Sequence, residues 1–142
     1  MTTILADARL GLMVSDSSIS SDDRVWSGPK VFRVRGDLYG FSGDVLEAER
    51  FLDWIKSDKA GRAPKFSSSE CLMLSHDGLF HFLASTTPSP VKGGIEAIGS
   101  GGKAARCAYQ ALGCFDPTQA VQIVCHHDSG SRAPVRTYKL RA

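Results

Sequence analysis

The 142-residue sequence has no apolar run that approaches the roughly 18 residues a membrane span needs, so we expect no membrane segment. Its start lacks a basic segment followed by an apolar one, so no signal peptide is expected. The formal net charge of +2 is too small and too dispersed to indicate nucleic-acid binding. These absences predict a cytoplasmic protein whose partners include neither membranes nor nucleic acids.

Cysteine spacing of the CxxC type is also missing, although the sequence contains four cysteines. Most of them lie in apolar stretches, which favours buried free thiols in a reducing compartment over disulfides or zinc ligands. The apolar fraction of 42% and the charged fraction of 23% are ordinary for a globular protein. With no internal repeat, this length predicts one domain over residues 1–142.

Short alternating segments predict strands joined as antiparallel hairpins. These segments are residues 3–6 and 12–15, 30–35 and 38–42, and 71–74 and 79–83. Residues 17–28 are polar and irregular and predict a loop, and residues 135–140 predict a closing strand. The first two hairpins already indicate an antiparallel sheet.

Helical spacing replaces this alternation after residue 44. Apolar residues at steps of three and four predict an amphipathic helix over 44–59. A second helix is expected over 103–112, ended by Gly113. Asp116-Pro117 is a good N-cap and first-turn pair for a third helix, which ends near residue 127. The order of elements predicts an α+β fold with antiparallel sheet covered by helices.

The chain starts Met1-Thr2-Thr3, and methionine before a small residue is commonly removed. An N-terminal threonine combines a nucleophilic Oγ with a base, its own α-amine, whose pKa is ordinarily about 7.7–8.0. Met-Thr starts are common in proteins that have no such chemistry. The start therefore carries meaning only together with other motifs.

Four further features follow in order: Asp16 after the second expected strand, Lys30-Val31-x-Arg33, Gly40-Phe41-x-Gly43 and the segment 97–102, Ala-Ile-Gly-Ser-Gly-Gly. With Thr2-Thr3-Ile4 they resemble the N-terminal-nucleophile threonine peptidases of the proteasome β-subunit family, in particular its HslV type. The resemblance runs over nearly the whole chain. It implies a four-layer αββα sandwich, in which two antiparallel sheets are covered by helices.

The resemblance also implies roles for individual residues. Thr2 Oγ would attack the scissile carbonyl, with the free α-amine as proton acceptor. Lys30 would sit beside Thr2 and favour the attacking form, and Asp16 would pair with Lys30 and keep it charged and oriented. Gly40 would donate a backbone N–H to the oxyanion. Ser100 would hydrogen-bond near the amine and help to relay its proton.

Two further implications concern the turn after the third helix. Asp128 and Ser131 match a pair that supports the catalytic serine and lysine. Main-chain carbonyls around this turn can hold a monovalent or divalent cation in the family, which makes Cys125, Asp128 and Ser131 candidates for a cation site. The acyl-transfer chemistry itself would require no cofactor.

Each of these residues has a plainer interpretation. Lys30 could be an exposed lysine at a strand end, and Asp16 could start a turn. Residues 99–102 could hold a phosphate before a helix, but the P-loop ending of lysine and serine or threonine is missing. His126 and His127, beside Cys125 and Asp128, invite a zinc site. Adjacent histidines at a helix end point in different directions, however, and no second pair of ligands is evident.

The sequence departs from the HslV type in one respect, because only one helix is expected between residues 44 and 71, where that type has two. Helices on this side help to build the rings of the family. We still expect a homo-oligomeric ring, peptide substrates and an AAA+ unfoldase ATPase as partner. Two alternatives remain open: a non-catalytic ring or scaffold protein with the same fold, and an N-terminal-nucleophile amidase acting on a small amide.

Overall fold

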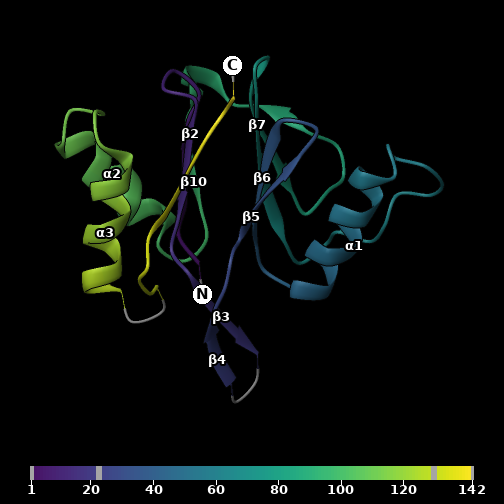
Figure 1. Ribbon diagram of the computed structural model, residues 1–142, viewed down its shortest axis with the longest axis horizontal. Helices are drawn as coiled ribbons and strands as arrows, with labels where there is room; N and C mark the ends of the chain where they lie inside the picture. The colour runs from purple at the N-terminus through teal and green to yellow at the C-terminus, as the bar shows by residue number, and fades with distance from the viewer. Residues whose placement is uncertain (1, 22–23, 129–130, 142) are drawn as a thin grey trace.

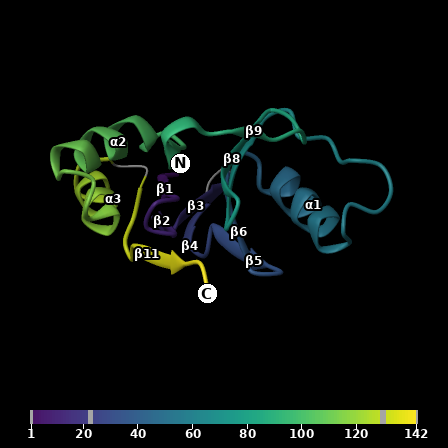
Figure 2. The ribbon, with the colours of Figure 1, turned by 90° about the horizontal axis from the view of Figure 1, so that it is seen from above.

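Two antiparallel sheets lie face to face, and helices cover their outer faces (Figure 1). This arrangement is seen in a computed structural model, which describes residues 2–21, 24–128 and 131–141. Seen from above, α1 lies on one side of the two sheets, and α2 and α3 lie on the other (Figure 2). The predicted four-layer αββα sandwich is confirmed.

The first sheet has the strand order β10-β1-β2-β11, and every neighbouring pair is antiparallel. Its strands are β1 (Ile4–Asp7), β2 (Leu12–Ser15), β10 (Ile95–Ile98) and β11 (Arg136–Lys139). Strand β1 is buried along its whole length because both faces of the sheet are covered. Ile4 faces the second sheet, whereas Leu5 packs against Tyr109 and Val121 in the helices.

The second sheet has the order β5-β6-β7-β8-β9. Its strands are β5 (Val31–Val34), β6 (Asp37–Ser42), β7 (Glu70–Ser75), β8 (Gly78–Leu83) and β9 (Ser89–Pro90). Alternate residues again face opposite layers: Leu38 and Leu72 pack toward the first sheet, and Tyr39 and Phe41 pack toward α1.

The helices begin and end close to the predicted residues. Helix α1 (Val45–Lys56) is capped by Asp44, whose side chain accepts the N–H of Glu47. Helix α2 is Gly102–Ala111, and α3 (Pro117–His127) is capped by Asp116. A short 3-10 helix, η1, covers Lys92–Gly94. A single helix, α1, lies between β6 and β7, as the sequence predicts. No helix in the described part of the chain is long and apolar enough to cross a membrane.

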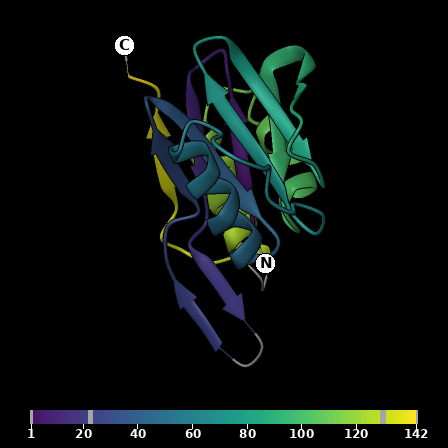
Figure 3. The same cartoon turned by 90° about the vertical axis from the view of Figure 1, so that its right-hand side faces the viewer.

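The predicted loop over residues 17–28 is wrong. This segment contains a two-stranded hairpin, β3 (Ser18–Ser21) and β4 (Arg24–Ser27), which projects from the end of the sandwich near the N-terminus (Figure 3). The serines hide the alternation on which the sequence argument depends. Main-chain pairing, with Ile19 opposite Trp26, forms the ladder instead.

Candidate active site

Thr2 lies immediately before β1 and is buried, with 8% of its surface exposed. Its carbonyl accepts the N–H of Gly101 at 3.1 Å. Its hydroxyl oxygen, Oγ1, accepts a hydrogen bond from Lys30 Nζ at 3.0 Å. Because Lys30 directly precedes β5, the threonine of one sheet meets a lysine of the other. The plainer interpretation of Lys30 as an exposed lysine is therefore wrong.

Asp16 follows β2 and is fully buried. One carboxylate oxygen, Oδ1, accepts from Lys30 Nζ at 2.8 Å and from the N–H of Thr3 at 3.0 Å. The other, Oδ2, accepts the backbone N–H groups of Ser18 and Arg132 at 3.0 and 3.1 Å. Four donors from separate segments fix this carboxylate. It holds the lysine in one orientation beside Thr2.

Burial makes the charged form of Lys30 less favourable than it is in water. Burial lowers the pKa of this ammonium below its usual 10.5, and the hydrogen bond and charge of Asp16 offset only part of the shift. The result is a cation that gives up a proton more easily than an exposed lysine does, placed at hydrogen-bond distance from a hydroxyl. This electrostatic arrangement suits a hydroxyl that is to become a nucleophile.

The turn after α3 reaches the residue next to Thr2. Ser131 Oγ donates to the Asp128 carboxylate at 2.8 Å and lies 2.7 Å from Thr3 Oγ1. A carboxylate only accepts, so Ser131 must use its proton on Asp128 and receive one from Thr3. The structure thus brings the predicted Asp128–Ser131 pair to the site through Thr3.

A cavity of about 540 Å³ opens beside Thr2. Lys30, Gly43 and Ser100 line it together with Thr2, and side chains of α1 and the second sheet, among them Phe41, Ala48 and Leu52, give it apolar walls. Its size is that of a small-molecule or peptide side-chain site. Ser100, which the family resemblance predicts to lie near the nucleophile, is exposed at this cavity.

Gly40, the predicted oxyanion donor, lies within β6, which is paired on both sides, with Val31 and Leu72 opposite Gly40. Its role at the oxyanion stays a prediction. A Cβ at this position would lie 2.9 Å from Met13 Sδ and 3.1 Å from Ile4 Cγ2. Gly40 is a glycine because the two sheets approach closely there.

Gly43, the last residue of the same motif, lines the cavity instead. Its φ of +117° favours glycine, and a Cβ there would lie 2.6 Å from the carbonyl oxygen of Ser68. Within the described residues, its N–H has no acceptor. Gly43 is not among the site residues predicted from the sequence, although the spacing Gly40-Phe41-x-Gly43 contains the signal.

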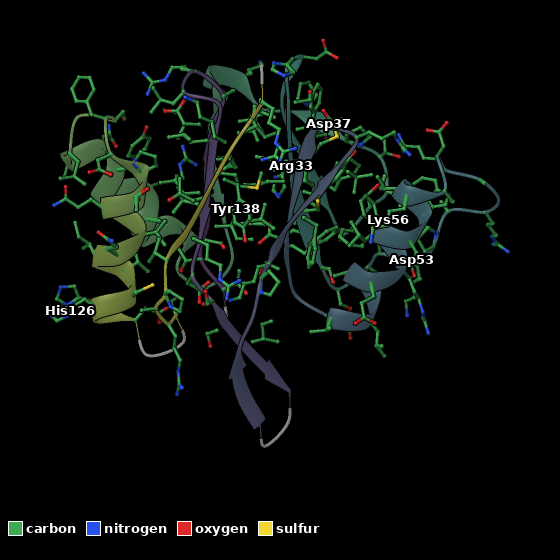
Figure 4. The ribbon with its side chains drawn as sticks, viewed as in Figure 1. Arg33, Asp37, Asp53, Lys56, His126 and Tyr138 are labelled. Atoms are coloured by element: carbon green, nitrogen blue, oxygen red, sulfur yellow. The ribbon has the colours of Figure 1, made fainter. Side chains whose placement is uncertain are left out.

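The described part of the chain holds no cluster of three or more His, Cys, Asp or Glu side chains suited to a metal. The predicted cation site, which consists of main-chain carbonyls, is not tested by this observation and stays a prediction. The carbonyl of Asp128, one proposed main-chain ligand, accepts the N–H of Ser131 at 3.2 Å. Burial raises the pKa of the Cys125 thiol to about 11. His126 points outward from α3, away from the sheets (Figure 4).

Comparison with known proteins gives the class of this fold. No family model and no curated protein matches the sequence. Solved structures do match, and they show that the chain has the HslV-like, proteasome β-type fold.

Three of these structures match nearly the whole chain. BPH from Thiobacillus denitrificans in complex with epoxomicin has a TM-score of 0.73 and 16% identity, over 99% of this chain and 100% of that chain. A second structure of BPH has the same TM-score and identity over 98% of both chains. Eukaryotic HslV from Trypanosoma brucei has a TM-score of 0.71 and 21% identity, over 96% of this chain and 99% of that one.

Proposed function

We propose that this protein is a threonine-type peptidase whose nucleophile is Thr2, made N-terminal by removal of Met1. The observation that carries the proposal is the 3.0 Å contact between Lys30 Nζ and Thr2 Oγ1, with Asp16 holding the lysine at 2.8 Å. Buried lysine–aspartate pairs are costly to form. In this one the lysine also donates a hydrogen bond to a threonine hydroxyl at the wall of a cavity.

The proposed reaction proceeds in two acyl-transfer steps. Thr2 Oγ forms a bond to the scissile carbonyl carbon, and its proton passes to the free α-amine. The amine returns this proton to the leaving nitrogen as the peptide bond breaks. Water, deprotonated by the same amine, then attacks the ester and releases Thr2 with its proton restored. Lys30 stabilises the developing negative charge on Oγ through its hydrogen bond.

Four other residues complete the proposal. The N–H of Gly43 is the candidate donor to the oxyanion, because it borders the cavity and has no acceptor among the described residues. Ser100, at the same cavity wall as Thr2, is the candidate relay for the amine proton. Asp128 and Ser131 hold Thr3, and with it the main chain next to the nucleophile.

The proposal extends to the surroundings of the enzyme. We propose that the chain acts in the cytoplasm, forms a homo-oligomeric ring and receives peptide substrates from an AAA+ unfoldase ATPase. The resemblance of its motifs to the HslV type supports this part.

The decisive experiment is intact mass spectrometry of the protein expressed from its own Met1, with and without epoxomicin. The epoxyketone of this inhibitor reacts with both the hydroxyl and the free amine of an N-terminal threonine. We expect a chain without Met1 that gains one inhibitor mass, and a Thr2→Ala variant that gains none.

Two outcomes would contradict the proposal. A chain that keeps Met1 and gains no inhibitor mass would favour the non-catalytic scaffold. A processed chain that hydrolyses a small amide but no peptide would favour the amidase. Parallel assays on one short peptide and one small amide separate these cases.

A further inference from the structure

Glu70, the first residue of β7, lies next to the proposed site but takes no part in the chemistry above. Its side chain is 25% exposed and lies on the same side of the strand as Leu72, which packs between the two sheets. Carboxylate oxygen Oε1 accepts the backbone N–H of Gly99 at 3.2 Å. A carboxylate of the second sheet thus reaches the loop that follows β10 in the first sheet.

Gly99 lies against the main chain of Thr2. A Cβ at residue 99 would lie 2.1 Å from the Thr2 carbonyl oxygen and 3.0 Å from Thr2 Cβ. Two residues later, Gly101 donates its N–H to the same carbonyl at 3.1 Å. Ser100, the candidate proton relay, stands between these two glycines. The position of this loop therefore sets the position of both Thr2 and Ser100.

The second carboxylate oxygen of Glu70 has a partner as well. His81 Nε2, on the neighbouring strand β8, lies 2.9 Å from Oε2. The histidine is also partly buried, with 22% of its side chain exposed. Because one oxygen is held by His81, the other is directed at Gly99. Two strands of the second sheet thereby aim one acceptor at the loop.

We propose that Glu70 is a positioning residue for the nucleophile: through the N–H of Gly99 it holds the 99–101 loop, and through that loop Thr2 and Ser100, with His81 directing its carboxylate. This inference rests on the proposed function for its catalytic consequence. Its structural part, a carboxylate that sets the loop against Thr2, is measurable whether or not the enzyme is active.

The structural part is tested by NMR of the full ¹⁵N-labelled chain. In Glu70→Ala we expect the amide proton of Gly99 to move upfield, because it loses a charged acceptor, and the amide of Gly101 to shift with it. Glu70→Asp should cause the same changes, because its shorter side chain withdraws the acceptor from Gly99. This variant replaces Glu70→Ala in the test if the alanine variant does not fold. Glu70→Gln keeps an oxygen for Gly99, although a neutral one, so both resonances should lie between those of the parent and those of Glu70→Ala.

Glu96 offers a matched control. It is also on a strand, its side chain is 23% exposed, and it also accepts one backbone N–H, that of Ala97, while pairing with a cationic side chain, Arg106. Glu96→Ala removes the same kinds of contact at a place that does not touch Thr2. It should leave the Gly101 amide and the labelling rate unchanged.

The catalytic part is read from epoxomicin labelling of Thr2. Loss of loop position should lower the rate constant at saturating inhibitor about tenfold in Glu70→Ala and Glu70→Asp, with the half-saturating concentration within about twofold of the parent, because the cavity is intact. Glu70→Gln should retain at least about a third of the parent rate.

Each other outcome has a definite meaning. A Gly99 amide that is insensitive to Glu70→Ala and Glu70→Asp overturns the proposal, and so does a shifted Gly99 with unchanged Gly101 and unchanged labelling. If the parent chain is not labelled at all, the proposed function fails separately. The positioning role is then tested by the Gly101 amide resonance alone. A shift of this resonance in Glu70→Ala and Glu70→Asp supports the role, and no shift overturns it.

Discussion

Lys30 Nζ lies 3.0 Å from Thr2 Oγ1, although the two are 28 positions apart in the chain and lie just before strands of different sheets. Asp16 completes the contact from the end of β2, at 2.8 Å from the same nitrogen. The sandwich places the starts of β1 and β5 and the end of β2 at one edge of the interface between the sheets. The proposed chemistry depends on this convergence.

Replacement of Lys30 by methionine tests the lysine itself. Methionine keeps the length and apolar packing but removes the donor to Thr2, so we expect the rate of epoxomicin labelling to fall by about a hundredfold or more. Circular dichroism should report an unchanged fold. Lys103→Met, at an exposed site on α2, is the control, and equal rates in the two variants would exclude a catalytic role for Lys30.

Asp16→Asn tests what holds the lysine. The amide presents N–H groups where the carboxylate accepted four donors, and it leaves the Lys30 charge buried without its partner. We expect the free energy of unfolding to fall by about 3–5 kcal/mol in urea denaturation. Asp77→Asn, at an exposed turn, should change it by less than about 0.5 kcal/mol. A small effect at Asp16 would mean that the pair adds little to stability.

Ala48→Phe tests whether the cavity receives the substrate. Ala48 lies on α1 at the cavity wall, and a phenyl group there occupies part of the 540 Å³. We expect the half-saturating concentration of epoxomicin to rise about tenfold, or about 1.4 kcal/mol of binding, with little change in the rate at saturation. Arg50→Phe, on an exposed position of the same helix, is the control. Unchanged affinity in Ala48→Phe would place the inhibitor elsewhere.

Glu47→Gln tests the loop that supports Gly43. The quantity to measure is the free energy of unfolding as a function of pH. The backbone N–H of Ser68 lowers the pKa of Glu47 below its usual 4.5, burial opposes this, and the hydroxyl of Ser69 adds to the lowering. A lowered carboxyl pKa stabilises the fold above the unfolded-state pKa, and this contribution is lost as the pH falls through the folded-state pKa. The parent should therefore be more stable than Glu47→Gln at pH 7.

Urea titrations of parent and variant between pH 7 and pH 3 measure this difference. The stability difference between parent and Glu47→Gln should stay constant down to about pH 5. It should disappear below pH 4.5, as the Glu47 carboxyl becomes protonated in both the unfolded and the folded state. Glu49→Gln, two residues along the same helix and exposed, should show no such trend. A difference that grows on acidification would contradict the assigned sign.

Most of the secondary structure could be predicted from local pattern. The apolar positions of α1, the Asp116-Pro117 start of α3 and the alternation in β5 and β6 are local signals, and each element is present. The β3–β4 hairpin was missed because its serines carry no period-two signal and its ladder is formed by the main chain. A pattern argument detects side-chain burial and does not detect backbone pairing.

The same distinction between local pattern and long-range contacts applies to the candidate site. The order of residues along the chain supplies the groups that are available: a threonine after Met1, an aspartate after β2, a lysine before β5 and a glycine motif at the end of β6. Which of these groups meet depends on how the two sheets pack. Gly40 and Gly43 look alike in the sequence, but Gly40 lies within a strand that is paired on both sides, whereas Gly43 lines the cavity. Glu70 gave no signal at all, because its contact with Gly99 joins two sheets, and long-range packing creates such contacts.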